Sequence, residues 1–112
     1  MADLDLVRGT LDVLVLRTLT AGPLHGYSVA RWIKKASEEA LLVEEGALYP
    51  ALHRLERKGW VKSEWGLSAN NRKAKFYALT GKGRQALEAE TSSWDRYVEA
   101  VRKVLDKEPE PA

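Results

Sequence analysis

The sequence predicts a mainly α-helical fold with one small β-hairpin: a winged helix-turn-helix followed by a long C-terminal helix. Three segments with apolar residues at helical spacing come first. Two short runs rich in aromatic and β-branched residues follow, and then a long segment with a seven-residue apolar repeat. Three helices and then a hairpin are typical of a winged helix-turn-helix, which presents its third helix to the DNA major groove.

The composition fits one folded domain. The chain has 112 residues, 45% hydrophobic and 30% charged, and it contains no cysteine, which excludes disulfides and thiolate zinc sites. His25 and His53 are too few for a metal cluster, so we expect no metal and no cofactor. Because no apolar run approaches the roughly 20 residues of a membrane helix, and residues 1–9 lack the order of a signal peptide, we expect a cytoplasmic protein that does not contact membranes.

The net charge of +2 conceals an uneven distribution along the chain. Residues 50–85 carry nine Lys and Arg against two acids, whereas residues 86–112 carry four basic residues against seven acids. A basic middle and an acidic end indicate one surface for a polyanion and another for a different partner. The alternative is a solvated surface whose charges are unevenly placed by chance.

The first two helices are expected at residues 7–20 and 26–37. Thr10 is a candidate N-cap of the first helix. Its apolar stripe consists of Leu11, Leu14, Val15 and Leu19. The stripe of the second consists of Val29, Trp32, Ile33 and Ala36. The Gly and Pro of "AGPLHG" indicate a turn between the two helices, and residues 37–45 read as a polar connection.

The third helix is expected within "GALYPALHRLERKGWV" at residues 46–61. Its leucines recur at helical spacing and form the stripe that faces the core. Gly46 is the expected N-cap and Gly59 the expected stop. With that cap, Pro50 lies close enough to the start to remove only the first internal hydrogen bond, at a cost well below the ~3 kcal/mol of a mid-helix proline.

The opposite face of this helix changes character along its length. Small residues at its start would let the backbone approach a groove wall, and free N–H groups there favour phosphate. Basic and polar residues further along could reach phosphates or guanine edges, although the wet side of an ordinary surface helix would look the same. This outer face consists of Gly46, Ala47, Pro50, His53, Arg54 and Arg57.

The hairpin is expected from residues 60–65 and 73–79, joined by the turn-forming "GLSANNR". Arg72, Lys73 and Lys75 lie at or near its tip. A basic tip can lie along a phosphate backbone or in a minor groove, which would make DNA affinity depend strongly on salt. The alternative is an ordinary exposed loop.

The last helix is expected over residues 80–106, with Thr80 as its candidate cap. Two seven-residue series run side by side along it and would leave large apolar groups exposed on an isolated helix. These series are Leu87, Trp94 and Val101, and Thr91, Val98 and Leu105. The chain therefore divides into a winged helix-turn-helix at 1–79, a C-terminal helix at 80–106 and a disordered tail at 107–112. The alternative is a last helix that folds back on its own core.

The sequence resembles the PadR family of transcriptional regulators over about residues 8–106. The resemblance is carried by "GPLHGYSVARWI" at 22–33, "GALYPALHRLERKGWV" at 46–61 and "KFYALTGKGRQAL" at 75–87. It implies a homodimeric winged-helix repressor that binds a palindromic operator in double-stranded DNA, with the C-terminal helix packed against the partner subunit. Tyr27, Tyr49 and Pro50 match positions of the family motif, and the two tyrosines are candidates for packing, for phosphate contact or for both.

The resemblance also implies a possible effector. Some family members bind flat aromatic molecules between paired tryptophans at the dimer interface, and Trp94 stands where such a residue would. An interface anchor is the alternative role for Trp94, because tryptophan is enriched at dimer cores. Asp95 and Glu99 beside it could favour a cation or could simply be solvated.

Two other functions compete with DNA binding. The basic surface could instead meet an acidic protein partner. An enzyme is disfavoured, because the sequence offers no nucleophile–base pair, carboxylate dyad or phosphate loop, and "GKGR" at 81–84 has the wrong length and context for such a loop.

Overall fold

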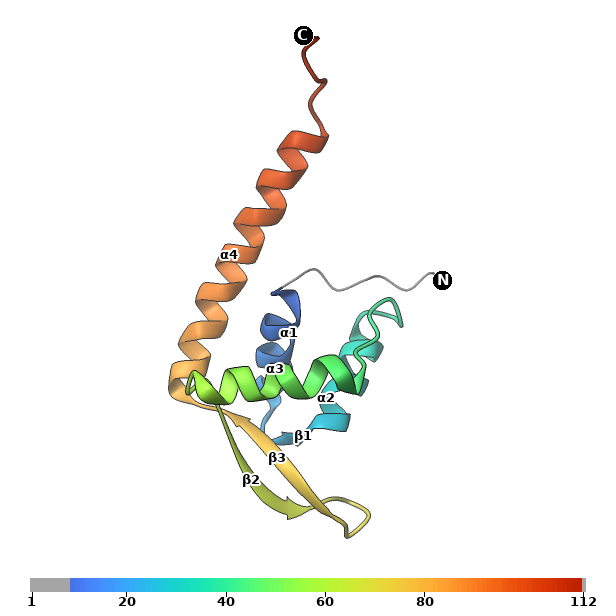
Figure 1. The fold of residues 1–112 in the computed structure, drawn as a ribbon, viewed down its shortest axis with the longest axis vertical. Helices are drawn as coiled ribbons and strands as arrows, with labels where there is room; N and C mark the ends of the chain where they lie inside the picture. The colour runs from blue at the N-terminus through green and yellow to red at the C-terminus, as the bar shows by residue number, and fades with distance from the viewer. Residues whose placement is uncertain (1–8, 112) are drawn as a thin grey trace.

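The computed structural model describes residues 9–111. Its elements are α1 (Thr10–Thr18), a 3-10 turn η1 (Leu19–Ala21), β1 (Leu24–His25), α2 (Gly26–Ala36), α3 (Glu45–Arg57), β2 (Val61–Leu67), β3 (Lys73–Leu79) and α4 (Gly81–Leu105). Residues 1–8 and 112 lie outside the described residues. The prediction that the N-terminus is no signal peptide falls on them, as do the first residues of segment 1–79 and the last residue of segment 107–112. The expected fold class is confirmed: helices, a small antiparallel sheet and a long C-terminal helix (Figure 1).

Within residues 9–111 the sheet has three strands instead of the expected two. Its order is β1-β3-β2, with all pairs antiparallel, and β1 places Leu24 opposite Tyr77 and His25 opposite Phe76. The expectation that "AGPLHG" is only a turn is therefore incomplete. A two-residue strand carries no periodicity of its own and is defined by the partner strand that it meets.

The core lies where α1, α2 and α3 meet the base of the hairpin. Figure 1 shows α3 crossing in front of α1, with the hairpin below and α4 rising beside them. The apolar stripes predicted for α1 and α3 face inward, and burial of apolar side chains is the main force that holds the three helices together. The stripe predicted for α2 is only half right: Val29 and Ile33 are buried, whereas Trp32 and Ala36 are exposed, because α2 meets the core along a narrower strip than the sequence pattern suggested. The buried apolar residues are Leu11, Val15, Leu16, Leu19, Val29, Ile33, Leu48, Ala51, Leu52, Leu55, Val61 and Tyr77.

Two helix starts differ from the prediction. Thr10 is the first residue of α1 and does not cap it; Gly9 precedes it with a φ of 88°, and no hydrogen-bond partner of the buried Thr10 Oγ1 lies in the described part of the chain. The helix α3 begins after Glu44, whose carbonyl accepts from Ala47 and Leu48, so Gly46 is inside the helix and is not its N-cap. Glutamate is not a preferred cap residue, which is why the local pattern pointed elsewhere.

The earlier start of α3 changes the position of Pro50. The proline now stands in the second turn, where it leaves the Gly46 carbonyl without an i→i−4 donor. Both residues are exposed, so water can satisfy that carbonyl. Pro50 therefore destabilises the helix more than the sequence suggested. Hydration of the exposed Gly46 carbonyl reduces this loss.

The junction of α3, β2 and α4 is closed as expected. Gly59 has a φ of 77°, and the N–H of Trp60 donates to the Leu55 carbonyl at 3.0 Å, a helix-ending pattern that favours glycine. Thr80 caps α4: its Oγ1 accepts from the N–H of Gly83 at 3.0 Å and donates to the carbonyl of Gly59 at 2.7 Å. These contacts hold the end of α3, the start of the hairpin and the start of α4 together.

The helix α4 leaves the body after its first half. Leu87 packs against the core and Trp94 is half-buried, whereas every side chain from Asp95 to Leu105 is exposed. The molecule is accordingly elongated, with extents of 64 × 33 × 21 Å, and α4 lies along the long axis. The first half of this helix thus packs on its own core, as the alternative proposed, whereas the half from Asp95 onward extends away from it. Within residues 9–111, no helix is both long enough and apolar enough to cross a membrane.

Candidate nucleic-acid interface

The outer face of α3 is exposed at each of its six expected positions. The core-facing side is fully occupied by Leu48, Ala51, Leu52 and Leu55, so the helix cannot rotate without breaking the core. At 100° per residue, His53 and Arg57 fall near the middle of the outer face. No ion pair involves either of them in the described part of the chain, which leaves both available to a ligand.

Arg54 is held differently. Its Nη2 donates to Oδ1 of Asp12 on α1 at 2.7 Å, and the Asp12 side chain is only 15% exposed. A charge-assisted contact of this length orients the guanidinium toward α1. Arg54 thus lies on the expected face but is tied to the neighbouring helix.

The N-terminus of α3 is acidic. Glu44 and Glu45 are both exposed there, where carboxylates favour the positive end of the helix dipole. They would repel a phosphate at the same place. The sequence prediction began the helix at Gly46 and so did not include Glu44 and Glu45. Their negative charges oppose the expected binding of phosphate by the free N–H groups near Gly46.

Tyr49 packs across the start of α2. Its ring lies so close to Gly26 that a Cβ there would stand 2.9 Å from the Tyr49 Oη. The side chain is still 38% exposed. Tyr49 therefore packs and also keeps an edge of its ring at the surface, which fits both roles considered from the sequence.

A groove of about 510 Å³ runs between the hairpin and the starts of α2 and α3. Aromatic rings from all three elements line it, and basic side chains come from the hairpin. It collects five of the predicted DNA-binding residues: Tyr27, Tyr49, Arg72, Lys73 and Lys75. The remaining six lie on the exposed face of α3 outside this groove.

Two groove residues were missed from the sequence. Trp65 on β2 is 61% exposed, and Lys73 Nζ stands 5.2 Å from the centroid of its ring. His25 on β1 accepts a hydrogen bond from the N–H of Ser28 at 3.4 Å and so caps α2. The position of His25 directly before a helix start could have indicated its capping role. The alternation of side chains along the strands could have placed Trp65 on the same face of the hairpin as Lys73 and Lys75.

Tyr77 lies at the back of the groove on β3 and is 3% exposed. Burial raises the pKa of its phenol above the usual value of 10.0, and the nearby Glu56 and Tyr49 raise it further. The phenol is therefore neutral at physiological pH, and the groove gains no negative charge from it.

A second cavity, of about 380 Å³, lies between the start of α1 and α4. The Trp94 and Tyr97 rings line it with centroids 6.2 Å apart and planes at 32°. Its acidic residue is Glu90, whereas Asp95 lines a different hollow and Glu99 pairs with Lys103 at 3.5 Å. The acids expected beside Trp94 are thus not the ones that face it.

Comparison with known proteins identifies the family. The model of the transcriptional regulator PadR-like family matches residues 15–89, which include α2, α3 and the whole hairpin. The chain belongs to this family.

Solved structures agree with this assignment. The PadR-family regulator from Eggerthella lenta is 31% identical, with a TM-score of 0.75 over 90% of this chain and 86% of that one. The PadR-family regulator from Clostridium difficile is 29% identical, with a TM-score of 0.73 over 87% and 99%. A transcriptional regulator from Clostridium thermocellum is 27% identical, with a TM-score of 0.78 over 86% and 93%.

Membership in the PadR-like family makes this chain a transcriptional regulator, a class that acts by binding DNA, and not an enzyme. The outer face of α3 and the groove beside the hairpin are the surfaces of this PadR-like regulator that suit that role. The hairpin is hereafter called the wing.

Proposed function

We propose that this PadR-like regulator is a cytoplasmic transcriptional repressor that binds a palindromic operator as a homodimer. The observation that carries the proposal is the arrangement of α3 and the wing. His53 and Arg57 are exposed on the outer face of α3, and Arg72, Lys73 and Lys75 line the groove beside it. A helix in the major groove and a basic wing on the flanking phosphates would use both surfaces at once.

The proposed dimer forms through α4. Large apolar side chains of its second half are exposed, and they recur at alternating spacings of three and four, as in a coiled coil. An exposed row of this kind favours burial of these side chains against a second helix. The exposed fractions are 44% for Val98, 38% for Val101 and 66% for Leu105, with Tyr97 at 57% and Val104 at 74% beside them.

The proposed interface residues do not all have the same role. Leu87 packs on the core of its own protomer, and Thr91 is exposed one turn further along α4. We propose that the continuous contact between protomers begins near Trp94. Two-fold symmetry would then place two recognition helices on one face, as a palindromic operator requires.

A small planar aromatic effector is the finer part of the proposal. Trp94 and Tyr97 offer two aromatic walls, and Glu90 offers one carboxylate. A flat cation would stack on the rings and pair with the acid. Release from the operator follows if that ligand changes the angle between α4 and α1.

DNA binding is tested by comparing Arg57→Ala with the wild type in a titration at fixed salt. We expect a several-fold loss of affinity with an unchanged melting temperature, because Arg57 makes no ion pair within the described residues. Unchanged affinity would refute the assigned role of the α3 face. An acidic protein partner would then become the better account of that face.

The effector is tested by tryptophan fluorescence with a panel of planar aromatic cations. Binding should quench emission in the wild type and not in Trp94→Ala, which leaves Trp32, Trp60 and Trp65 as internal background. Quenching that survives in Trp94→Ala would contradict the proposed ligand site.

A further inference from the structure

One hollow of the described chain has no role in the function proposed above. It is a groove of about 870 Å³ between the end of α1 and the outer side of α2, here called the α1–α2 groove. Tyr27 and Trp32 contribute exposed rings to it, 63% and 45% exposed, and Leu24 and Ala21 contribute apolar surface. Its charged residues are Arg17, Arg31, Lys34, Lys35 and Glu39.

The α1–α2 groove is strongly basic. Four cations against one carboxylate give it a formal charge of +3, although the whole chain carries only +2. Lys34 Nζ lies 3.9 Å from Glu39 Oε1, which leaves Arg17, Arg31 and Lys35 without a carboxylate partner among the described residues. The Arg31 guanidinium stands 5.6 Å from the Tyr27 ring centroid. The groove therefore suits a segment that is anionic and partly apolar.

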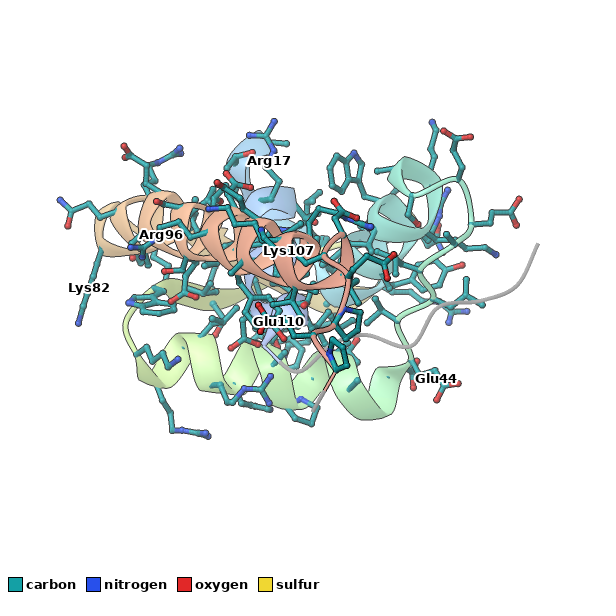
Figure 2. All side chains as sticks on the ribbon, turned by 90° about the horizontal axis from the view of Figure 1, so that it is seen from above. Arg17, Glu44, Lys82, Arg96, Lys107 and Glu110 are labelled. Atoms are coloured by element: carbon teal, nitrogen blue, oxygen red, sulfur yellow. The ribbon has the colours of Figure 1, made fainter. Side chains whose placement is uncertain are left out.

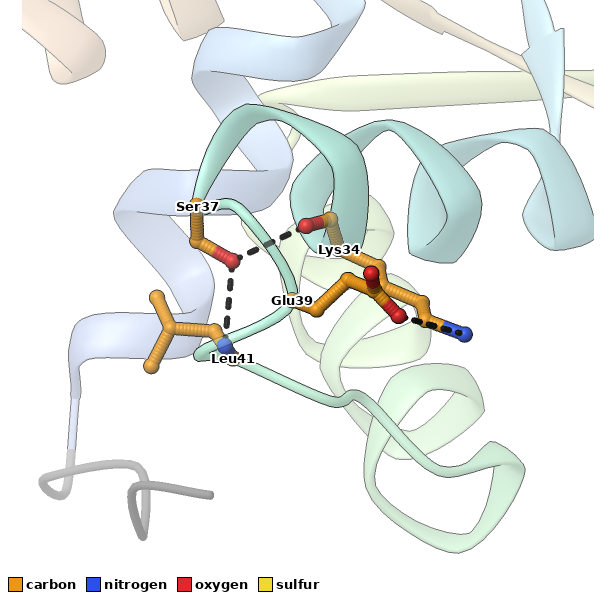
Figure 3. A network of polar contacts seen from close by, with 4 residues as sticks. All are labelled: Lys34, Ser37, Glu39 and Leu41. Carbon is orange, nitrogen blue, oxygen red and sulfur yellow. Dashed lines mark hydrogen bonds and ion pairs between the residues drawn. The ribbon is translucent and has the colours of Figure 1, made fainter. Parts of the chain in front are cut away.

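Hydrogen bonds order the turn after α2, which lies at one end of the groove. Ser37 Oγ donates to the Lys34 carbonyl at 3.1 Å and accepts from the N–H of Leu41 at 3.0 Å (Figure 3). Glu38 and Glu39 both have positive φ, at 52° and 67°. These bonds stabilise the turn after α2 and fix the place of Lys34 at the groove's rim.

DNA is a poor occupant for the whole groove. In the view from above, Arg17 lies at one side of α4, and α3 with Glu44 lies at the opposite side (Figure 2). A duplex read by α3 would therefore face away from Arg17. The groove approaches the wing only at Tyr27, which lines both hollows.

The chain itself contains a segment of complementary chemistry. After α4, residues 106–111 read "DKEPEP", with three acids and one lysine. Residues 108–111 have no regular structure and are exposed. Their two prolines favour an extended conformation, and extended proline-containing segments bind grooves lined with aromatic rings. Carboxylates and prolines thus match the two features of the α1–α2 groove.

The tail is directed away from the groove of its own chain. It starts at the end of α4 that is remote from α2 (Figure 1). An extended segment of six residues spans at most about 21 Å, whereas α4 alone is about 37 Å long. A second copy, crossing at the exposed half of α4, would bring its own tail to this body.

We propose that the acidic tail of one protomer, residues 106–111, binds in the α1–α2 groove of the second protomer. This inference rests on the homodimer of the proposed function. The tails would exchange reciprocally and add ion pairs to the apolar contact of α4. The groove thus has a specific partner: an extended, proline-containing acidic segment of the same chain.

Disulfide trapping tests this placement directly, because the chain has no cysteine. Lys35→Cys and Glu108→Cys proteins carrying different tags are mixed and oxidised. We expect a mixed disulfide between them and none above background between Lys62→Cys, on the wing, and Glu108→Cys. Equal yields for the two pairs would overturn the proposal.

Two further samples separate the other outcomes. In the double variant Lys35→Cys with Glu108→Cys, a disulfide within one chain would place the tail on its own body and overturn the exchange. In Glu108→Gln with Glu110→Gln, the dimer dissociation constant should rise about tenfold at low salt, as a few exposed ion pairs predict, and the rise should disappear at high salt. An unchanged constant would also overturn the exchange.

The same samples distinguish this inference from the proposed function. Suppose that Glu108→Gln with Glu110→Gln forms as stable a dimer as the wild type, and that Lys35→Cys and Glu108→Cys form no mixed disulfide. The tail exchange then fails and the α4 dimer stands. If the wild type is a monomer at all concentrations, the dimer fails first. A loss of operator affinity in Lys35→Glu, with no trapped disulfide, would assign the groove to DNA and also overturn the tail exchange.

Discussion

Arg54 Nη2 on α3 and Asp12 Oδ1 on α1 are 2.7 Å apart, although the two residues are separated by 42 positions in the chain. The contact ties α3 to α1. It also directs one of the three basic and polar side chains of the α3 face away from the middle of that face. His53 and Arg57 make no ion pair with the described residues, and they are the side chains of this face that we propose contact DNA.

Arg54 and Arg57 should therefore respond differently to the same substitution. Arg54→Ala should lower the free energy of unfolding by about 0.5–1 kcal/mol, since the pair is partly exposed, and should weaken DNA binding less than Arg57→Ala does. Arg57→Ala should leave stability nearly unchanged. Urea unfolding and DNA titration of both variants check this, and the reverse ranking in both assays would contradict the pairing. Asp12→Asn combined with Arg54→Ala should be no less stable than Arg54→Ala alone.

The two glycines at the start of α4 offer a matched pair. A Cβ at Gly83 would lie 2.0 Å from the Trp60 carbonyl oxygen, whereas a Cβ at Gly81 would meet nothing within 4 Å. Gly83→Ala should cost about 2–3 kcal/mol or prevent folding, because backbone must move to admit the methyl group. Gly81→Ala should be neutral or stabilising by up to about 1 kcal/mol. Equal melting temperatures for the two variants would show that the close contact of α4 with Trp60 is absent.

The wing should contribute to affinity through phosphate contacts. Each phosphate that a basic side chain neutralises adds about 0.9 to the slope of log affinity against log salt. Arg72→Ala with Lys73→Ala should therefore lower that slope by up to about 2, with little change in sequence preference. Titrations at several salt concentrations measure it. A preserved slope together with altered base preference would mean that the wing reads sequence.

The buried phenol of Tyr77 should make the fold sensitive to alkali. Burial and then Glu56 raise the pKa of Tyr77 in the folded chain, while the unfolded chain titrates near 10. The stability that depends on the neutral phenol is thus fully present below pH ~10 and is lost as pH rises through the folded pKa. Urea unfolding from pH 8 to 11 should show a steeper loss in the wild type than in Tyr77→Phe. The exposed Tyr97→Phe serves as control and should behave like the wild type.

Local signals in the sequence were enough for most of the fold. Apolar periodicity located the helices, and Gly59 and Thr80 were recognised as helix stop and cap because both act within one helical turn. The start of α3 was misplaced because Glu44 and Glu45 carry no strong cap signal. The strand β1 was missed because two residues have no pattern without β3.

The candidate site also contains features that the sequence predicts and features that only the fold determines. The exposed face of α3 followed from a helical wheel, since the leucines fix which side is buried. The link between Arg54 and Asp12 depends on how α1 packs on α3, which no single-helix argument contains. The meeting of Trp65 with Lys73 depends on the register of β2 and β3, which the loop composition alone did not give. Glu90 and Trp94 stand four residues apart on α4, so their shared face was available from the sequence and was overlooked. Sequence thus predicted which face of α3 is exposed, and the fold determined which of its side chains are held by other described residues.

If α3 and the wing bind DNA as parts of a dimer, the protein should select a palindromic site. Selection of bound sequences from a random double-stranded library, with the purified wild-type protein at fixed salt, tests it most directly. We expect enrichment of an inverted repeat whose half-sites lie about one helical turn, or a multiple of it, apart, and loss of that enrichment in Arg57→Ala. A library that remains random after repeated rounds, or equal enrichment of the same repeat by Arg57→Ala, would contradict it.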